Sequence, residues 1–248
     1  QRRHQYAPTA VHDAPHLVPF SNGVVDVDGK CYPHSADHRV LAEHVLPFDH
    51  DAGATCPLWE TTLGEIFEGD EDAGDKMAFL QEWIGLALLG QATEAQRHPI
   101  LLGEAANNGK SVIMDVLTAL FPEPAVGSVG PHKWGESFGL EPLLRARVNI
   151  VAELPSRELL GAAEIKGVLT GDGVSVNRKN EKAVRSHRFR IGHLFSCNRL
   201  PPSADRSAGL FRRFVILELH NLFVDSPKGS RERLADPHRA KKIARAEM

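Results

Sequence analysis

The chain has 248 residues, of which 42% are hydrophobic and 25% are charged, and its formal net charge is −3. This composition is typical of a globular protein with one sizeable core and a smaller satellite region, and it excludes an intrinsically disordered chain. No apolar run reaches the roughly 18 residues of a membrane span, and the N-terminal stretch lacks the apolar core of a signal peptide. We therefore expect a protein of the cytosol with no membrane partner, in which the separated residues Cys31, Cys56 and Cys197 are reduced thiols.

Charge is distributed unevenly along the chain. Residues 1–80 sum to −9 and residues 81–248 to +6, and between Arg178 and Arg213 ten Lys or Arg face two acids, Glu181 and Asp205. Such a basic stretch is either an ordinary solvated surface or a surface that binds nucleic acid. Because no Met begins the sequence and its end falls within a helical pattern, we expect a piece of a longer protein.

The first part of the chain, residues 1–75, is predicted to be a loop-rich accessory region. It alternates short apolar segments with Gly, Pro, His and Asp, and it closes in the acidic stretch EGDEDAGD, which is typical of a linker. Apolar positions at helical spacing then predict an amphipathic helix over residues 76–92, within a helical segment, 76–97, that leads into the main domain.

Residues 98–225 alternate strand and helix patterns. Short apolar runs predict strands at 98–103, 125–129, 148–153, 189–198 and 214–219, and helical patterns cover 111–121 and 161–171. This alternation predicts an α/β fold with a mostly parallel five-stranded sheet flanked by helices on both faces. Residues 226–248 are expected to begin a further, truncated segment.

The junction between the first of these strands and the next helix, GEAANNGKSV, carries most of the P-loop pattern G-x-x-x-x-G-K-[ST]. In that pattern backbone N–H groups cradle phosphates, the Lys reaches the outer phosphates and the hydroxyl reaches Mg²⁺. Gly103 lies one residue too early, so either Ala105 or Ala106 bulges or Gly103 is not the equivalent of the first glycine. A glycine-rich helix start without a ligand would explain neither Lys110 nor Ser111. The residues expected to bind the nucleotide are Gly103, Asn107, Asn108, Gly109, Lys110, Ser111 and Val112.

Polar residues that follow the later strands are candidates for catalysis. Glu153 can polarise an attacking water or hold the metal together with Ser111, and Asn198 can orient that water. Arg212 and Arg213, before the last strand, can stabilise transition-state charge in a neighbouring subunit's site. Each candidate also has an explanation without catalysis. Glu153 can be an ordinary acid after a strand, Asn198 can form a turn, and Arg212 and Arg213 can be a surface pair.

In this order the motifs NNGKS, VNIVAEL, EIKGVLTGD, LFSCNRLPP and GLFRRFVILEL resemble those of superfamily-three helicases of the poxvirus and phage primase–helicase type. The resemblance covers nearly the whole chain. It implies a P-loop ATPase with an AAA+-like sheet, ATP and Mg²⁺ as cofactors, a hexameric ring of copies of this chain, and single-stranded DNA as the partner. By position it implies that Lys110 and Ser111 belong to Walker A, Glu153 to Walker B, Asn198 to the sensor and Arg212 or Arg213 to the arginine finger.

The resemblance also sets expectations about neighbouring parts. A linked primase or polymerase domain is an implied partner, although the chain carries no primase motif, and the family's wing-like C-terminal segment is expected to be cut off after Met248. The chain departs from the family at Ala105 and Ala106, where glycines are usual, and at Ala152, where many relatives carry a second acid. The departure at Ala152 leaves metal binding by Glu153 an open question.

Residues 174–195 read as two strands joined by a polar turn around Asn180, Glu181 and Lys182, which predicts a hairpin that leads into Asn198. The resemblance implies that this hairpin grips the DNA backbone, with Lys179, Lys182 and Arg185 as the contacts. The alternative is a basic hairpin that is merely exposed to solvent.

Two other functions remain open, a P-loop ATPase that remodels protein and a nucleotide-binding ring scaffold that does not hydrolyse ATP.

Overall fold

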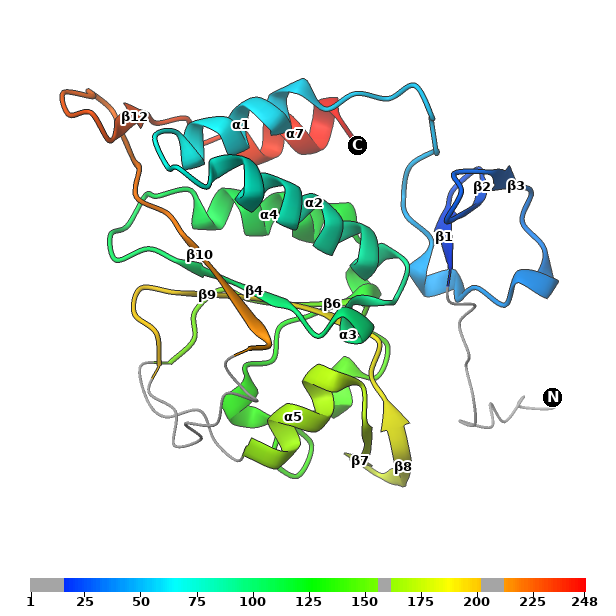
Figure 1. The fold of residues 1–248 in the computed structure, drawn as a ribbon. Coiled ribbons are helices and arrows are strands. Elements are labelled where there is room, and N and C mark those ends of the chain that lie inside the picture. The colour runs from blue at the N-terminus through cyan, green and yellow to red at the C-terminus, as the bar shows by residue number, and fades with distance from the viewer. Residues whose placement is uncertain (1–15, 156–161, 202–211) are drawn as a thin grey trace.

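The computed structural model describes residues 16–155, 162–201 and 212–248 (Figure 1). At its centre is one five-stranded sheet, in which the strands are ordered β10-β4-β9-β6-β5 and every neighbouring pair is parallel. Its strands are β4 (His98–Leu102), β5 (Val126–Gly127), β6 (Val148–Val151), β9 (Gly192–Cys197) and β10 (Phe214–Glu218). The predicted α/β fold, with a five-stranded parallel sheet between helices, is confirmed.

Successive residues of the central strands point into two different cores. Leu101 contributes to a core shared with α1 (Pro57–Phe67), α2 (Ala73–Leu88) and α4 (Lys110–Leu120). Ile100, its neighbour in the chain, contributes to a second core with α5 (Ala162–Thr170). Figure 1 shows α1, α2 and α4 on one side of the sheet and α5 on the other. Because both faces are covered, strands such as β6 are buried at every residue, and this explains their mostly apolar sequences.

The N-terminal part contains a small antiparallel sheet of β1 (Leu17–Phe20), β2 (Gly23–Asp26) and β3 (Cys31–Tyr32). Two 3₁₀ helices, η1 (Ala36–His38) and η2 (Ala42–His44), follow, and α1 then packs into the same core as the central sheet. The acidic stretch after α1 is packed rather than free. The Asp70 carboxylate is almost fully buried, 2.9 Å from Lys76 Nζ and 2.8 Å from Arg231 Nη1.

Short elements connect the main ones. They are α3 (Ala92–Ala95) before β4, η3 (Glu123–Ala125), η4 (Pro131–Lys133) and η5 (Glu141–Leu143) between α4 and β6, and β11 (Leu222–Val224), β12 (Glu232–Leu234) and α7 (Arg239–Ala246) after β10. The last helix is joined to the first, because the Glu247 carboxylate accepts hydrogen bonds from the backbone N–H groups of Leu58 (2.6 Å) and Trp59 (2.9 Å). A carboxylate at this position satisfies N–H groups that the first turn of α1 leaves free.

The predicted hairpin is present as β7 (Gly173–Arg178) and β8 (Glu181–Arg188). Its turn is Lys179–Asn180, one residue earlier than expected, and Asn180 adopts a left-handed backbone with φ of 60°. Within residues 16–155, 162–201 and 212–248, no helix is long and apolar enough to cross a lipid bilayer.

Candidate nucleotide site

The loop between β4 and α4 is tightly closed. Gly103 follows β4, and a Cβ atom there would lie 1.9 Å from Asn108 Nδ2 and 3.2 Å from Lys110 Nζ. Gly109 precedes α4 with φ of 92°, and a Cβ atom there would lie 2.7 Å from Ile66 Cγ1. Both glycines are therefore required by close packing, and the second also by its backbone conformation.

Lys110 places its ammonium group at the mouth of this loop. Its Nζ donates to the carbonyl oxygens of Gly103 (2.7 Å) and Ala105 (3.3 Å) and to Asn108 Oδ1 (2.9 Å). Burial lowers the pKa of Lys110, while the neighbouring Cys197 and Glu153 oppose that shift. The lysine is thus a half-buried cation held among polar atoms at the start of α4.

Asn107 and Asn108 shape the loop. Asn107 adopts a left-handed backbone with φ of 56°, and its carbonyl oxygen accepts a hydrogen bond of 2.7 Å from the N–H of Phe223 in β11. Asn108 is buried, and its Nδ2 donates to the Ala105 carbonyl oxygen at 2.9 Å. Asn107 is therefore the residue of the loop with a left-handed backbone before Gly109, whereas Ala105 and Ala106 have no positive φ.

Glu153 and Asn198 reach the same edge of the sheet as this loop. Leu102 pairs with Cys197, and Val151 pairs with Phe195, so Gly103, Glu153 and Asn198 all follow the carboxyl ends of adjacent strands. Both side chains are exposed at this edge. The backbone N–H of Leu154 donates to the Ser196 carbonyl oxygen at 2.8 Å and fixes the segment that carries Glu153. The expected cluster of lysine, glutamate and asparagine is thus formed by three neighbouring strands.

The two arginines lie elsewhere. Phe214 pairs with His98 at the start of β4, so Arg212 and Arg213 are at the amino edge of the sheet, opposite the loop. Arg212 is exposed, and its carbonyl oxygen accepts a hydrogen bond from the exposed Arg97 guanidinium. Arg213 is only 9% exposed. Within one copy, neither arginine is part of the Lys110 cluster.

The three hairpin cations are exposed, as a phosphate contact requires. Lys179 lies in the turn, and Lys182 and Arg185 lie on β8. Arg178 is instead engaged in an ion pair with Glu181 across the turn.

Several residues at the nucleotide site were not identified from the sequence. Cys197 is a buried thiol beside Lys110, and burial raises its pKa while the lysine lowers it. Ile66 from α1 packs on Gly109, and Phe223 from β11 holds Asn107. Ile66 and Phe223 come from segments distant in sequence, so no local pattern could have indicated them, whereas Cys197 directly precedes Asn198 in the motif LFSCN.

The site fits a phosphate group and, in part, a metal. No side chain in the described part of the chain caps the N-terminus of α4, which leaves backbone N–H groups for an anion next to the Lys110 cation. Among the described residues no three His, Cys, Asp or Glu gather into a metal cluster. Magnesium commonly uses one or two protein oxygens together with substrate phosphates, so Ser111 and Glu153, both exposed at this edge, are a sufficient protein contribution.

Comparison with known families finds two matches. A family of unknown function, DUF5906, matches residues 101–213, and the D5 N terminal like family matches residues 3–68. The D5 N terminal like match supports the likeness to superfamily-three primase–helicases that the motifs carry. The DUF5906 match spans the nucleotide loop, the hairpin and the arginine pair of the chain.

Solved structures share the fold. Two apo structures of the NrS-1 C-terminal region match with TM-scores of 0.57 and 0.58 at 18% identity, over 76% of this chain. The chain spans only 42% and 43% of those proteins. A structure of JCV helicase with a bound small molecule matches with a TM-score of 0.42 at 15% identity, over 67% of this chain and 46% of that one. No curated protein matches the sequence.

Proposed function

We propose that this chain is the ATPase part of a DNA helicase from a phage, viral or mobile-element replication protein. It would hydrolyse ATP at the interfaces of a hexameric ring and translocate on single-stranded DNA, next to a linked primase or polymerase domain. The observation that carries the proposal is the meeting of Lys110, Glu153 and Asn198 at one edge of the sheet.

These residues can perform the chemistry of phosphoryl transfer, which needs positioning and charge stabilisation above all. The Lys110 ammonium offsets negative charge on the outer phosphate, and its half-buried position strengthens that interaction. The exposed Glu153 carboxylate orients a water molecule and takes its proton, while the Asn198 amide hydrogen-bonds the same water or the phosphate. Bound Mg²⁺–ATP would supply the phosphoanhydride bond and a cation for the phosphate charge, with Ser111 and Glu153 as the protein's metal ligands.

A ring explains why the arginines lie far from Lys110. An exposed Arg212 at the amino edge of one copy can face the carboxyl edge of the next copy in a head-to-tail interface. It would then stabilise transition-state charge in the neighbour's site.

The decisive experiment measures ATP hydrolysis with and without single-stranded DNA. A helicase hydrolyses ATP faster when DNA is added. A protein-remodelling ATPase hydrolyses ATP without responding to DNA, and a ring scaffold binds ATP without turnover, so either result would reject the helicase proposal.

A further inference from the structure

The β7–β8 hairpin is packed against the body of the protein along its inner half. Val176 and Phe189 are each 1% exposed and belong to the core that also contains Ile165 and Val168 of α5. Beyond Val176 the strand residues become exposed, and so does the Lys179–Asn180 turn. The outer half of the hairpin therefore needs another attachment if it is to keep a fixed position.

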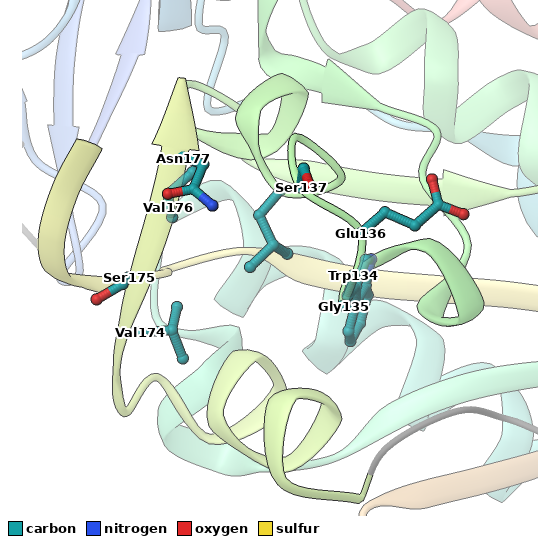
Figure 2. Close-up of a pocket in the computed structure, with 9 residues that line it drawn as sticks. Trp134, Gly135, Glu136, Ser137, Val174, Ser175, Val176 and Asn177 are labelled. Atoms are coloured by element: carbon teal, nitrogen blue, oxygen red, sulfur yellow. The ribbon is translucent and has the colours of Figure 1, made fainter. Parts of the chain in front are cut away.

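A hollow separates β7 from the nearest loop. It has a volume of about 480 Å³. Figure 2 shows Val174, Ser175, Val176 and Asn177 of β7 on one side of it and Trp134–Ser137 on the other. Because no side chain of the described residues fills this space, the loop of residues 134–137 does not support β7 by packing on this side.

Next to this hollow, the Glu141 side chain connects the body of the protein to the hairpin turn. Both of its carboxylate oxygens accept from the backbone N–H of Lys179 in the turn, Oε1 at 3.2 Å and Oε2 at 3.1 Å. Glu141 is itself fixed, because its own N–H donates to the Phe138 carbonyl oxygen at 3.1 Å. It also begins η5, whose Leu143 is completely buried.

We propose that Glu141 is a positioning residue that fastens the hairpin turn to the body and connects DNA held by the hairpin to the nucleotide site. The connection rests on the proposed function. Glu141 leads through η5 into β6, the strand that ends before Glu153. The hairpin's other connection runs through β8 and β9 to Asn198. Glu141 thus links the hairpin turn to Glu153, whereas the continuous chain through β8 and β9 links the turn to Asn198.

The contact is tested first without any activity, by hydrogen exchange at the Lys179 amide. A hydrogen bond to a charged group protects the amide that donates it, so Glu141→Ala should accelerate exchange at this amide roughly tenfold. Glu141→Gln keeps an oxygen acceptor and should accelerate exchange less. Glu136→Ala is the matched control, because Glu136 borders the same hollow and is exposed, and its variant should leave exchange unchanged. Equal exchange at Lys179 in wild type and Glu141→Ala would overturn the proposal.

Coupling is tested by the ratio of ATP hydrolysis with single-stranded DNA to hydrolysis without it. This ratio should fall several-fold in Glu141→Ala, recover largely in Glu141→Gln and stay at the wild-type value in Glu136→Ala. A wild-type ratio in Glu141→Ala would overturn the coupling role. If wild type itself shows no DNA stimulation, the helicase proposal and the coupling role fail together, whereas faster exchange at Lys179 would still establish the attachment.

Discussion

At the scale of single residues, Lys110 is the first residue of α4, whose N-terminus no described side chain caps. Lys110→Ala removes the charge partner of the outer phosphate, and losing such a group costs about 10²–10³-fold in turnover. We expect hydrolysis in this variant to fall to background in a steady-state ATPase assay. Lys241→Ala, which removes an exposed lysine from α7, is the control with wild-type turnover. Ordinary turnover in Lys110→Ala would place the site elsewhere in the molecule.

Glu153 is expected to act on water rather than on the nucleotide. Glu153→Gln is nearly isosteric but its amide cannot accept the proton of the attacking water, so this variant should bind ATP while hydrolysis falls by about 10²–10⁴-fold. Binding of a fluorescent ATP analogue and single-turnover hydrolysis measure the two properties separately. Glu123→Gln, an exposed glutamate outside the site, should match wild type in both. Normal turnover in Glu153→Gln would make Glu153 structural.

Buried His98 makes stability depend on pH. Burial is the main cause that lowers its pKa to about 4, and the charge of Arg213 contributes in the same direction. Between the ordinary pKa of 6.5 and about 4, the unfolded chain binds a proton that the folded chain does not. The free energy of unfolding should therefore fall as the pH decreases through this window, by up to about 3 kcal/mol.

The partner of His98 in the neighbouring strand, His193, has a pKa lowered by burial and by His98, so its titration has the same sign. Urea denaturation at pH 7.5 and pH 5 should show a smaller loss of stability on acidification in His98→Asn than in wild type. The exposed His220 provides the control, since His220→Asn should keep the wild-type loss. An equal loss in His98→Asn would assign the pH dependence to other groups.

At the scale of elements, the sequence patterns predicted the sheet best. Strands such as β4 and β6 are covered on both faces, so nearly all of their residues are apolar, and this local signal is sufficient. Helix α1 was missed because it lies in a stretch rich in Gly and Pro, and its stability depends on distant partners. Asn221 Nδ2, for example, donates to the carbonyl oxygens of Glu65 (3.0 Å) and Ile66 (3.2 Å) near its end. Asn221 is 156 residues from Glu65 in the sequence, so a local pattern around either segment does not indicate this contact.

The hairpin is the element on which DNA binding is predicted. Lys182 is exposed on β8 near the turn, so Lys182→Ala should remove one phosphate contact per subunit. The slope of log affinity against log salt for single-stranded DNA should then become shallower by roughly 0.7 for each phosphate that is no longer neutralised. Fluorescence anisotropy across a salt series measures this slope. Figure 1 places α7 at the end of the molecule away from the hairpin, so Lys241→Ala is a matched control for the loss of one positive charge. An unchanged slope in Lys182→Ala would show that this lysine does not hold the strand.

At the scale of the whole molecule, the sequence predicted which candidate residues gather at the carboxyl edge of the sheet but not what supports them there. Lys110, Glu153 and Asn198 could be placed together because parallel strands bring their carboxyl ends to one edge. The support of the loop could not be predicted, because it comes from Phe223 after the last strand of the sheet and from Ile66 in α1. These contacts join segments more than 40 residues from Gly109, and only the packed structure brings them together.

Under the proposed function, a complete catalytic site combines residues of two copies of the chain. Arg212 and Lys110 lie at opposite edges of the same sheet, so Arg212 can act on a phosphate at Lys110 only from a neighbouring copy. Lys110→Ala and Arg212→Ala should each be inactive alone. In a ring of randomly mixed copies, roughly a quarter of head-to-tail interfaces would combine an intact lysine with an intact arginine, so mixing should restore up to about that share of wild-type hydrolysis.

The mixing experiment is measured with equal amounts of the two variants over a range of total protein concentration. Activity should rise more steeply than the concentration, because interfaces form by association. The same mixture made with Arg213→Ala tests the second arginine, whose low exposure favours Arg212 as the residue that reaches a neighbour. Lys110→Ala mixed with Glu153→Gln serves as a further control. The mixture of Lys110→Ala with Glu153→Gln should stay inactive. Lys110 and Glu153 belong to the same copy's site, so no interface in this mixture contains both an intact Lys110 and an intact Glu153 in one site. A wild-type protein that stays monomeric and hydrolyses ATP at a rate per molecule independent of protein concentration would contradict a site shared between copies.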